Sequence, residues 1–191
     1  MGYTQQKKIR KNKISKNKRS DILKRVWQKK RPVLFFIGGF CILMVLFYIV
    51  FPTSFYKNNI HPFVVLVYAK ISGFILNLAG QNTQVRGDEI ISARFMINLK
   101  KGCDAVEAMA VYASALLAFP AKWKKKIKGL LIGLAVLFVL NIIRVVSLFL
   151  AGVYAPKFFD LMHVEVWQVL FILIAVVMWI GWARKAIKND E

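Results

Sequence analysis

The chain has 191 residues, of which 58% are hydrophobic, and its mean hydropathy is +0.51. A soluble domain of this length cannot bury that much apolar surface, so the composition excludes an ordinary soluble protein and indicates an integral membrane protein. The formal net charge of +20 is unevenly placed, because thirteen of the 29 basic residues lie in residues 7–31, where Asp21 is the single acid.

Residues 1–31 form a basic N-terminal tail. We expect this tail to stay in the cytoplasm and to touch anionic lipid headgroups, since lysine and arginine are retained on that side of a membrane. It lacks the interleaved aromatic residues that would favour nucleic-acid binding, so no nucleic-acid partner is expected. No small-residue cleavage site follows the apolar run 33–50, which indicates an uncleaved anchor. Residues 32–191 are then one membrane-embedded domain.

Three segments, 33–50, 129–150 and 164–182, approach the ~20 apolar residues that cross a ~30 Å hydrocarbon core. The segment 104–120 is shorter and begins with acids, but it is largely apolar from Ala110 onward, so we predict a fourth span that starts in the interface. Their orientation follows from three basic clusters, which lie in the tail, at 122–128 and at 184–188. Since cytoplasmic loops carry the excess of lysine and arginine, all three clusters and both termini are predicted to be cytoplasmic. The sequence therefore predicts an all-α polytopic membrane protein with about four transmembrane helices.

The apolar segment 62–80 fits this count only if it does not cross, because one more crossing would move a basic cluster to the outer side. Lys70, Gly73 and Asn77 fall on one helical face of this segment, which suits an amphipathic helix at the membrane surface. After an Arg-Gly-Asp turn, the residues up to Leu99 alternate between apolar and polar. Period-two alternation is typical of a strand, so we expect a small extracytoplasmic β element within 84–99.

Cys103 begins the second predicted span, directly after Lys100 and Lys101. Free backbone N–H groups, the helix dipole and the two lysines would favour its thiolate, whereas Asp104 and Glu107 oppose it. Glu107 shares a helix face with Cys103 and with small residues further along, a stripe that faces a bundle interior and not lipid. From composition alone, a cysteine at a helix start also fits a purely structural role.

Two more ionisable residues are predicted at a similar depth near the outer leaflet. Arg144 lies within the third span, about two turns from its outer end, and Asn141 shares its helix face. His163 begins the fourth span. Ionisable residues within spans are costly and by default mark a pathway or a site, so we expect these side chains to form one.

This combination fits catalysis by a cysteine nucleophile. Cys103 would attack a carbonyl carbon after His163 removes the thiol proton. Arg144 would donate hydrogen bonds to the oxyanion that forms, because its guanidinium is permanently charged. Asn141 would orient Arg144 or add a second donor, and Glu107 would support the site.

The remaining cysteine and histidine have simpler interpretations. Cys41 lies in the middle of the first span among large apolar residues, which predicts a buried small hydrophobic residue. The two histidines, His61 and His163, lack metal-ligand spacing with the cysteines, so we expect no metal. No glycine-rich nucleotide motif is present in the sequence, and no cofactor is expected.

The order Cys103, Asn-x-x-Arg at 141–144 and His163 resembles the exosortase/archaeosortase family of membrane transpeptidases, whose pattern is Cys, Asn-x-x-Arg, His. The short chain and the phrase GCDAVEA followed by ALLAFP look most like the H-type exosortases. The resemblance covers roughly residues 102–182. It departs from the family at Asp104 and Ala105, because many members have Cys-Ser-Gly where this chain has Cys-Asp-Ala, and many members are longer.

The resemblance implies a protein-sorting reaction at the extracytoplasmic face of a bacterial inner membrane. The substrates would be exported proteins whose C-terminal sorting signal contains a short motif, a hydrophobic helix and a basic tail. Cys103 would cleave a peptide bond in the motif through a thioester acyl-enzyme, and the cleaved protein would then pass to an acceptor. The sequence does not identify the motif or the acceptor.

Two other classes of function compete with this interpretation. In a non-enzymatic scaffold or assembly protein, Arg144 would form interhelical ion pairs with Glu107 or Glu165, and the sulfur of Cys103 would be dispensable. In a small transporter subunit, Arg144 and Glu107 would form a substrate or proton site, and changes of acid to amide would matter more than the cysteine.

Overall fold

The computed structural model describes residues 27, 30–99 and 104–188. In chain order, the elements are a first helix Lys30–Val50, η1 (Tyr56–Ile60), α2 (His61–Leu78), β1 (Gln84–Arg86), β2 (Glu89–Ile91), β3 (Met96–Asn98), α3 (Val106–Ala118), α4 (Trp123–Tyr154), η2 (Pro156–Phe158), η3 (Leu161–Val166) and α5 (Trp167–Lys188). The segments η1 and η3 are π-helical and η2 is a 3₁₀ turn.

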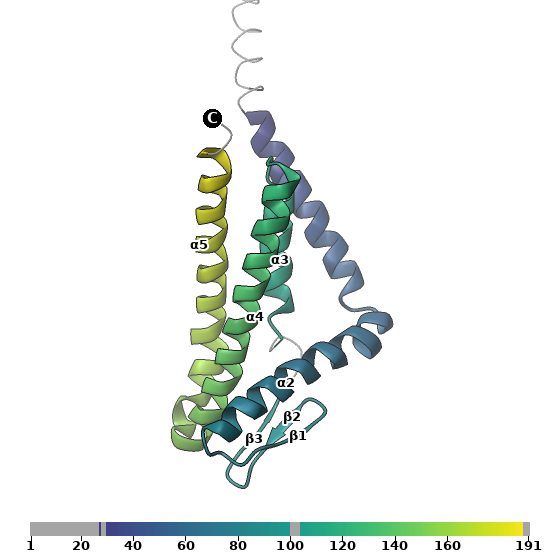
Figure 1. Cartoon of the computed structure of the whole chain (residues 1–191). Coiled ribbons are helices and arrows are strands. Elements are labelled where there is room, and N and C mark those ends of the chain that lie inside the picture. The colour runs from purple at the N-terminus through teal and green to yellow at the C-terminus, as the bar shows by residue number, and fades with distance from the viewer. Residues whose placement is uncertain (1–26, 28–29, 100–103, 189–191) are drawn as a thin grey trace, which may run out of the picture.

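A bundle of α3, α4 and α5 forms the centre of the molecule (Figure 1). The first helix slants beside this bundle, α2 runs across its lower end, and the small sheet lies below α2. The Tyr68 ring of α2 stacks on Phe138 of α4, with ring centroids 4.8 Å apart. The first helix is attached near its beginning, where Phe36 stacks on Trp179 of α5 at 5.5 Å.

Four helical segments are long and apolar enough to cross a membrane: Lys30–Val50, Tyr56–Leu78, Trp123–Tyr154 and Leu161–Lys188. Three of them contain the predicted spans 33–50, 129–150 and 164–182. The prediction of an all-α polytopic membrane protein with about four such helices and a small β element is therefore confirmed.

The helix within the predicted span 104–120 is shorter than expected. It comprises only the 13 residues of α3, which extend about 20 Å. Ala105, directly before α3, has a left-handed backbone with φ of 55°, so the helix cannot begin earlier. Phe119 is extended with ψ of 136°, as is typical of the residue before a proline, and Pro120 ends the helix.

The segment Tyr56–Leu78 has the length and composition of a membrane span. In Figure 1, however, α2 runs across the lower end of α4 and not alongside it. This direction suits the surface helix expected at 62–80, whose place in the membrane stays a prediction.

The expected β element is present as a three-stranded antiparallel sheet in the order β1-β2-β3. It docks on the α2 face that carries Gly73 and Asn77, where the Thr83 hydroxyl donates a hydrogen bond to the Gly73 carbonyl at 3.1 Å. A Cβ atom at Gly73 would collide with the Val85 side chain, so the close approach requires glycine. Part of the predicted polar face of this helix thus packs on the sheet, whereas Lys70 on the same face is exposed.

The basic segments gather at one end of the bundle. The first helix begins, α4 begins and α5 ends at the upper end in Figure 1. There the Lys125 ammonium donates to the Ala186 carbonyl at 2.8 Å, and the Trp182 indole N–H donates to the Lys125 carbonyl at 3.2 Å. This common end is what the predicted orientation of the basic clusters requires.

Glycine at position 133 lets α3 and α4 approach, because a Cβ there would overlap the ring of Tyr112, whose hydroxyl donates to the Gly129 carbonyl at 3.0 Å. We expect Gly133→Ala to destabilise the protein by about 1–3 kcal/mol through overpacking. The measurement is the melting temperature in detergent. Gly38→Ala is the control, since a Cβ there meets nothing within 4 Å, and it should be neutral or stabilising. An unchanged melting temperature for Gly133→Ala would contradict this close packing of α3 on α4.

Candidate active site

The polar centre of the molecule starts from one face of α4. Asn141 and Arg144 lie about three turns before the end of α4 and are 0% and 8% exposed. They share the buried face of the helix with Leu137, Val145 and Leu148, because residues three or four apart point the same way. Both predicted side chains therefore face the bundle interior.

Arg144 and His163, predicted to act together, do lie close to one another. The guanidinium of Arg144 lies over the ring of Phe171 in α5, 5.7 Å from its centroid. Its charge also acts on the imidazole of His163 in η3. That imidazole stacks on Phe159 at 5.6 Å with an interplanar angle of 24°. The guanidinium and the imidazole are thus held by aromatic rings from separate segments.

The ion pairs expected for a scaffold are not found in the described part of the chain, where no salt bridge joins Arg144 to Glu107 or Glu165. Glu165 is exposed.

Cys41 was predicted to be buried, but the structure shows it exposed, because none of the apolar stretch of the first helix is buried against the rest of the protein. In a bilayer this surface of the first helix faces lipid.

Cys103, the predicted nucleophile, lies outside the described residues. Its neighbour in sequence, Asp104, is described and is 1% exposed. One Asp104 carboxylate oxygen accepts a hydrogen bond from the Tyr56 hydroxyl at 3.3 Å and lies 3.8 Å from Nε2 of His61. The other accepts the backbone N–H of Val106 at 3.3 Å, at the start of α3. The start of α3 is thereby tied to the segment that leads into α2.

The Tyr68 hydroxyl interacts with the Asn141 amide of α4 and lies in the field of the Asp104 charge. Polar groups from η1, α2, the beginning of α3 and the Asn141 face of α4 therefore gather in one region. Buried polar groups need such partners, because an unsatisfied one costs about 1–3 kcal/mol.

The roles of Tyr56, His61 and Tyr68 were not predicted from the sequence, and Asp104 was expected only to oppose a thiolate. A weak signal exists for two of these residues. Asp104 is an acid directly before a largely apolar helix, and His61 is one of only two histidines. Nothing in the sequence singles out the two tyrosines.

A cavity of about 370 Å³ opens beside this cluster, between the first helix, α3, α4 and α5. Four of its lining residues are polar or charged and come from the lower ends of α3 and α5 and from α4: Asp104, Glu107, Arg144 and Gln168. Further along α3 and α5 the lining is apolar and combines small residues with large ones: Ala108, Val111, Ala115, Ala175 and Val176 alternate with Tyr112, Phe171, Ile172 and Trp179. The cavity thus has a charged end and an apolar end.

A comparison with known protein families gives a match. The model of the transmembrane exosortases matches residues 32–181, which include α3, α4, most of the first helix and of α5, and every predicted site residue. The chain belongs to the transmembrane exosortase family. This membership supports a sorting function in the membrane, and it leaves the basic tail outside the matched region.

No curated protein and no solved structure gave a significant match to this exosortase. One departure from the family pattern has a structural counterpart, however. Where the family pattern Cys-Ser-Gly has glycine, this exosortase has Ala105, and Ala105 adopts the left-handed backbone that glycine favours, with φ of 55°. The turn before α3 is therefore made at a cost of about 1 kcal/mol.

Removal of the Asp104 carboxylate should weaken the fold. We expect Asp104→Ala to destabilise this exosortase by about 1–3 kcal/mol, because the Tyr56 hydroxyl and the Val106 N–H both lose their acceptor. The melting temperature in detergent measures the effect. The exposed Glu165→Ala is the matched control and should stay within about 0.5 kcal/mol. If both variants have the same melting temperature as the wild type, the Asp104 cluster does not stabilise the protein.

Proposed function

We propose that this exosortase is a cysteine transpeptidase that cleaves the C-terminal sorting signal of exported proteins and transfers the cleaved protein to an acceptor. The observation that carries the proposal is the buried Arg144, which lines the charged end of an otherwise apolar cavity and whose charge also acts on His163. Family membership supports the same class of activity.

In the proposed mechanism, His163 removes the proton from the Cys103 thiol, and the sulfur attacks the carbonyl carbon of the scissile peptide bond. The oxyanion that forms accepts hydrogen bonds from Arg144. The tetrahedral intermediate then collapses to a thioester, and His163 returns its proton to the leaving amine. A nucleophile on the acceptor attacks the thioester and releases the Cys103 sulfur.

Two residues would position these groups without reacting. Asn141 lies one turn before Arg144 on the same face, and its amide interacts with Tyr68. This contact helps to orient the hydrogen-bond donors of Asn141 and Arg144. Donors that are already oriented suit oxyanion stabilisation, because little free energy is spent on reorientation when the charge develops. Glu107 lines the same cavity and would contribute to its charged end.

The shape of the cavity supports a substrate with a polar motif next to a hydrophobic helix. The motif would lie among the charged residues around Arg144, and the hydrophobic helix would pack on the small residues of α3 and α5. Small residues at a helix interface allow close backbone approach, which is how transmembrane helices pair. The basic tail of the substrate would then remain on the cytoplasmic side.

The proposed setting is a bacterial inner membrane, with the basic segments and both termini cytoplasmic and the Arg144 site extracytoplasmic. The common end of the basic segments supports this orientation. The H-type subfamily is proposed on the sequence phrases alone. The scaffold alternative is less favoured, because the described residues hold no ion pair between Arg144 and Glu107 or Glu165.

Loss of the nucleophile or of the oxyanion donor should abolish processing. We expect Cys103→Ser and Arg144→Lys to lower cleavage of a co-expressed exported protein that carries such a sorting signal by at least about 100-fold. Accumulation of the uncleaved protein on a gel measures the loss. Cys41→Ser is the control and should process normally. Normal cleavage by Cys103→Ser would rule out the thioester mechanism, and a larger loss in Glu107→Gln or Glu165→Gln would favour the transporter or the scaffold.

The reactivity of Cys103 can be tested without a substrate. In a Cys41→Ala background, a membrane-impermeant thiol reagent applied to intact cells should label Cys103 rapidly at neutral pH, because a neighbouring base raises the thiolate fraction. His163→Ala should slow this labelling. Labelling only from the cytoplasmic side would refute the orientation. Labelling that is equally rapid with and without His163→Ala would refute the role of His163 as the base.

A further inference from the structure

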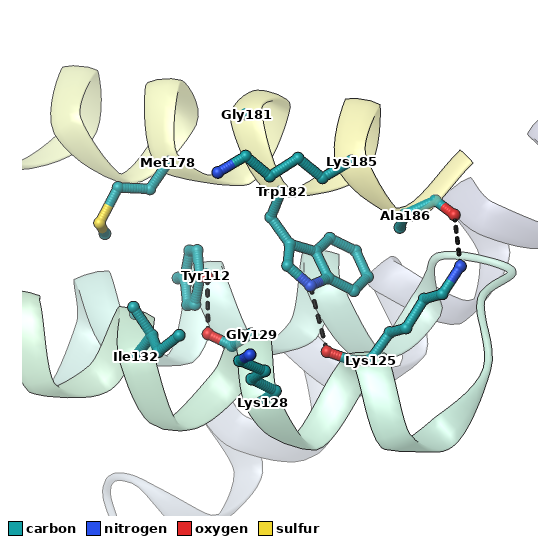
Figure 2. Close-up of a pocket in the computed structure, with 11 residues that line it drawn as sticks. Tyr112, Lys125, Lys128, Gly129, Ile132, Met178, Gly181, Trp182, Lys185 and Ala186 are labelled. Carbon is teal, nitrogen blue, oxygen red and sulfur yellow. Dashed lines mark hydrogen bonds between the residues drawn. The ribbon is translucent and has the colours of Figure 1, made fainter. Parts of the chain in front are cut away.

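A second cavity, of about 480 Å³, lies at the basic end of the bundle, remote from Arg144 (Figure 2). It is enclosed by α3, α4 and α5, and the Tyr112 ring lines both this cavity and the Arg144 cavity. None of the proposed catalytic residues lines it, so the sorting reaction leaves it without a role.

The walls of this cavity are fixed by hydrogen bonds between the helices, drawn as dashed lines in Figure 2. The Trp182 indole N–H donates to the Lys125 carbonyl at 3.2 Å, and the Lys125 ammonium donates to the Ala186 carbonyl at 2.8 Å. The Tyr112 hydroxyl donates to the Gly129 carbonyl at 3.0 Å. A cavity held open in this way needs little rearrangement to receive a ligand.

The lining combines positive charge with an apolar floor. Lys125 and Lys128 come from α4 and Lys185 from α5, and no lining residue is acidic. The floor is formed largely by Ile132, Met178 and Trp182. A ligand that matches this lining carries negative charge at one end and an apolar chain behind it, because a small soluble anion would leave the apolar floor unused.

We propose that this cavity binds one anionic phospholipid, such as phosphatidylglycerol. Its phosphate lies between Lys128 and Lys185, which are exposed on different helices and face the same opening. One acyl chain extends along Ile132 and Met178, toward the surface that these membrane helices present to lipid. Basic pockets between transmembrane helices at the headgroup level are suited to acidic lipids.

The test uses the purified full-length protein in detergent, mixed with phosphatidylglycerol or with phosphatidylcholine of the same acyl chains, and native mass spectrometry to count retained lipids. The wild type should retain phosphatidylglycerol preferentially. Lys128→Gln/Lys185→Gln should weaken that binding about 30-fold, since each lysine near the headgroup contributes about tenfold or less. Lys124→Gln/Lys188→Gln is the matched control, because it removes the same charge from the same helix ends at positions that do not line the cavity.

A second variant tests the acyl-chain half of the proposal. Gly181 lines the cavity and a Cβ there meets nothing within 4 Å, so Gly181→Leu adds an apolar side chain at the cavity edge. It should lower retention of phosphatidylglycerol while every lysine remains. The melting temperature of each variant verifies that it is folded.

Three results would overturn the proposal. Equal retention of the two lipids by the wild type would mean a non-selective apolar site. Equal losses in the two lysine double variants would mean that total charge, and not this cavity, attracts the lipid. Displacement of phosphatidylglycerol by millimolar inorganic phosphate would mean a soluble anion is the natural occupant.

Discussion

A guanidinium buried within a membrane helix constrains much of this molecule. A charged side chain at membrane depth is costly unless the protein supplies a polar or aromatic environment for it. Arg144 obtains this environment from two other segments, through the Phe171 ring of α5 and the coupling to His163 in η3. Packing of α4 against α5 therefore provides an environment for the Arg144 charge as well as burying apolar side chains.

The segment that crosses the lower end of the bundle completes the same cluster. α2 brings His61 and Tyr68, and η1 brings Tyr56, to the carboxylate of Asp104. The sheet holds α2 in place through the close approach at Gly73. The segment from η1 to β3 is thus more than a connection between helices, because it supplies the partners that a buried carboxylate requires.

Much of this arrangement could be predicted from the sequence. Apolar runs of membrane length are a strong signal, so the long helices that contain 33–50, 129–150 and 164–182 were predicted correctly. The length of α3 was not predicted correctly. The helix begins after the left-handed backbone of Ala105, and the sequence has no glycine there to signal a turn.

The contacts of Asp104 were also beyond prediction. Tyr56 precedes it by 48 residues, and no local periodicity relates the two positions. Likewise, the face of α2 with Gly73 and Asn77 has the pattern of a water-exposed surface, and only the docking of the sheet covers it. Helical periodicity indicates which residues share a face, but the partner of that face is set by tertiary structure.

The unequal lengths of α3 and α4 have a consequence for the surrounding bilayer. α3 extends about 20 Å and the 32-residue α4 about 48 Å, whereas the hydrocarbon core is about 30 Å thick. This hydrophobic mismatch requires the membrane to thin beside α3, or α4 to tilt and protrude. Where the membrane thins beside α3, a helix that packs there has less hydrocarbon to cross than one in the bulk bilayer, so a shorter apolar segment suffices.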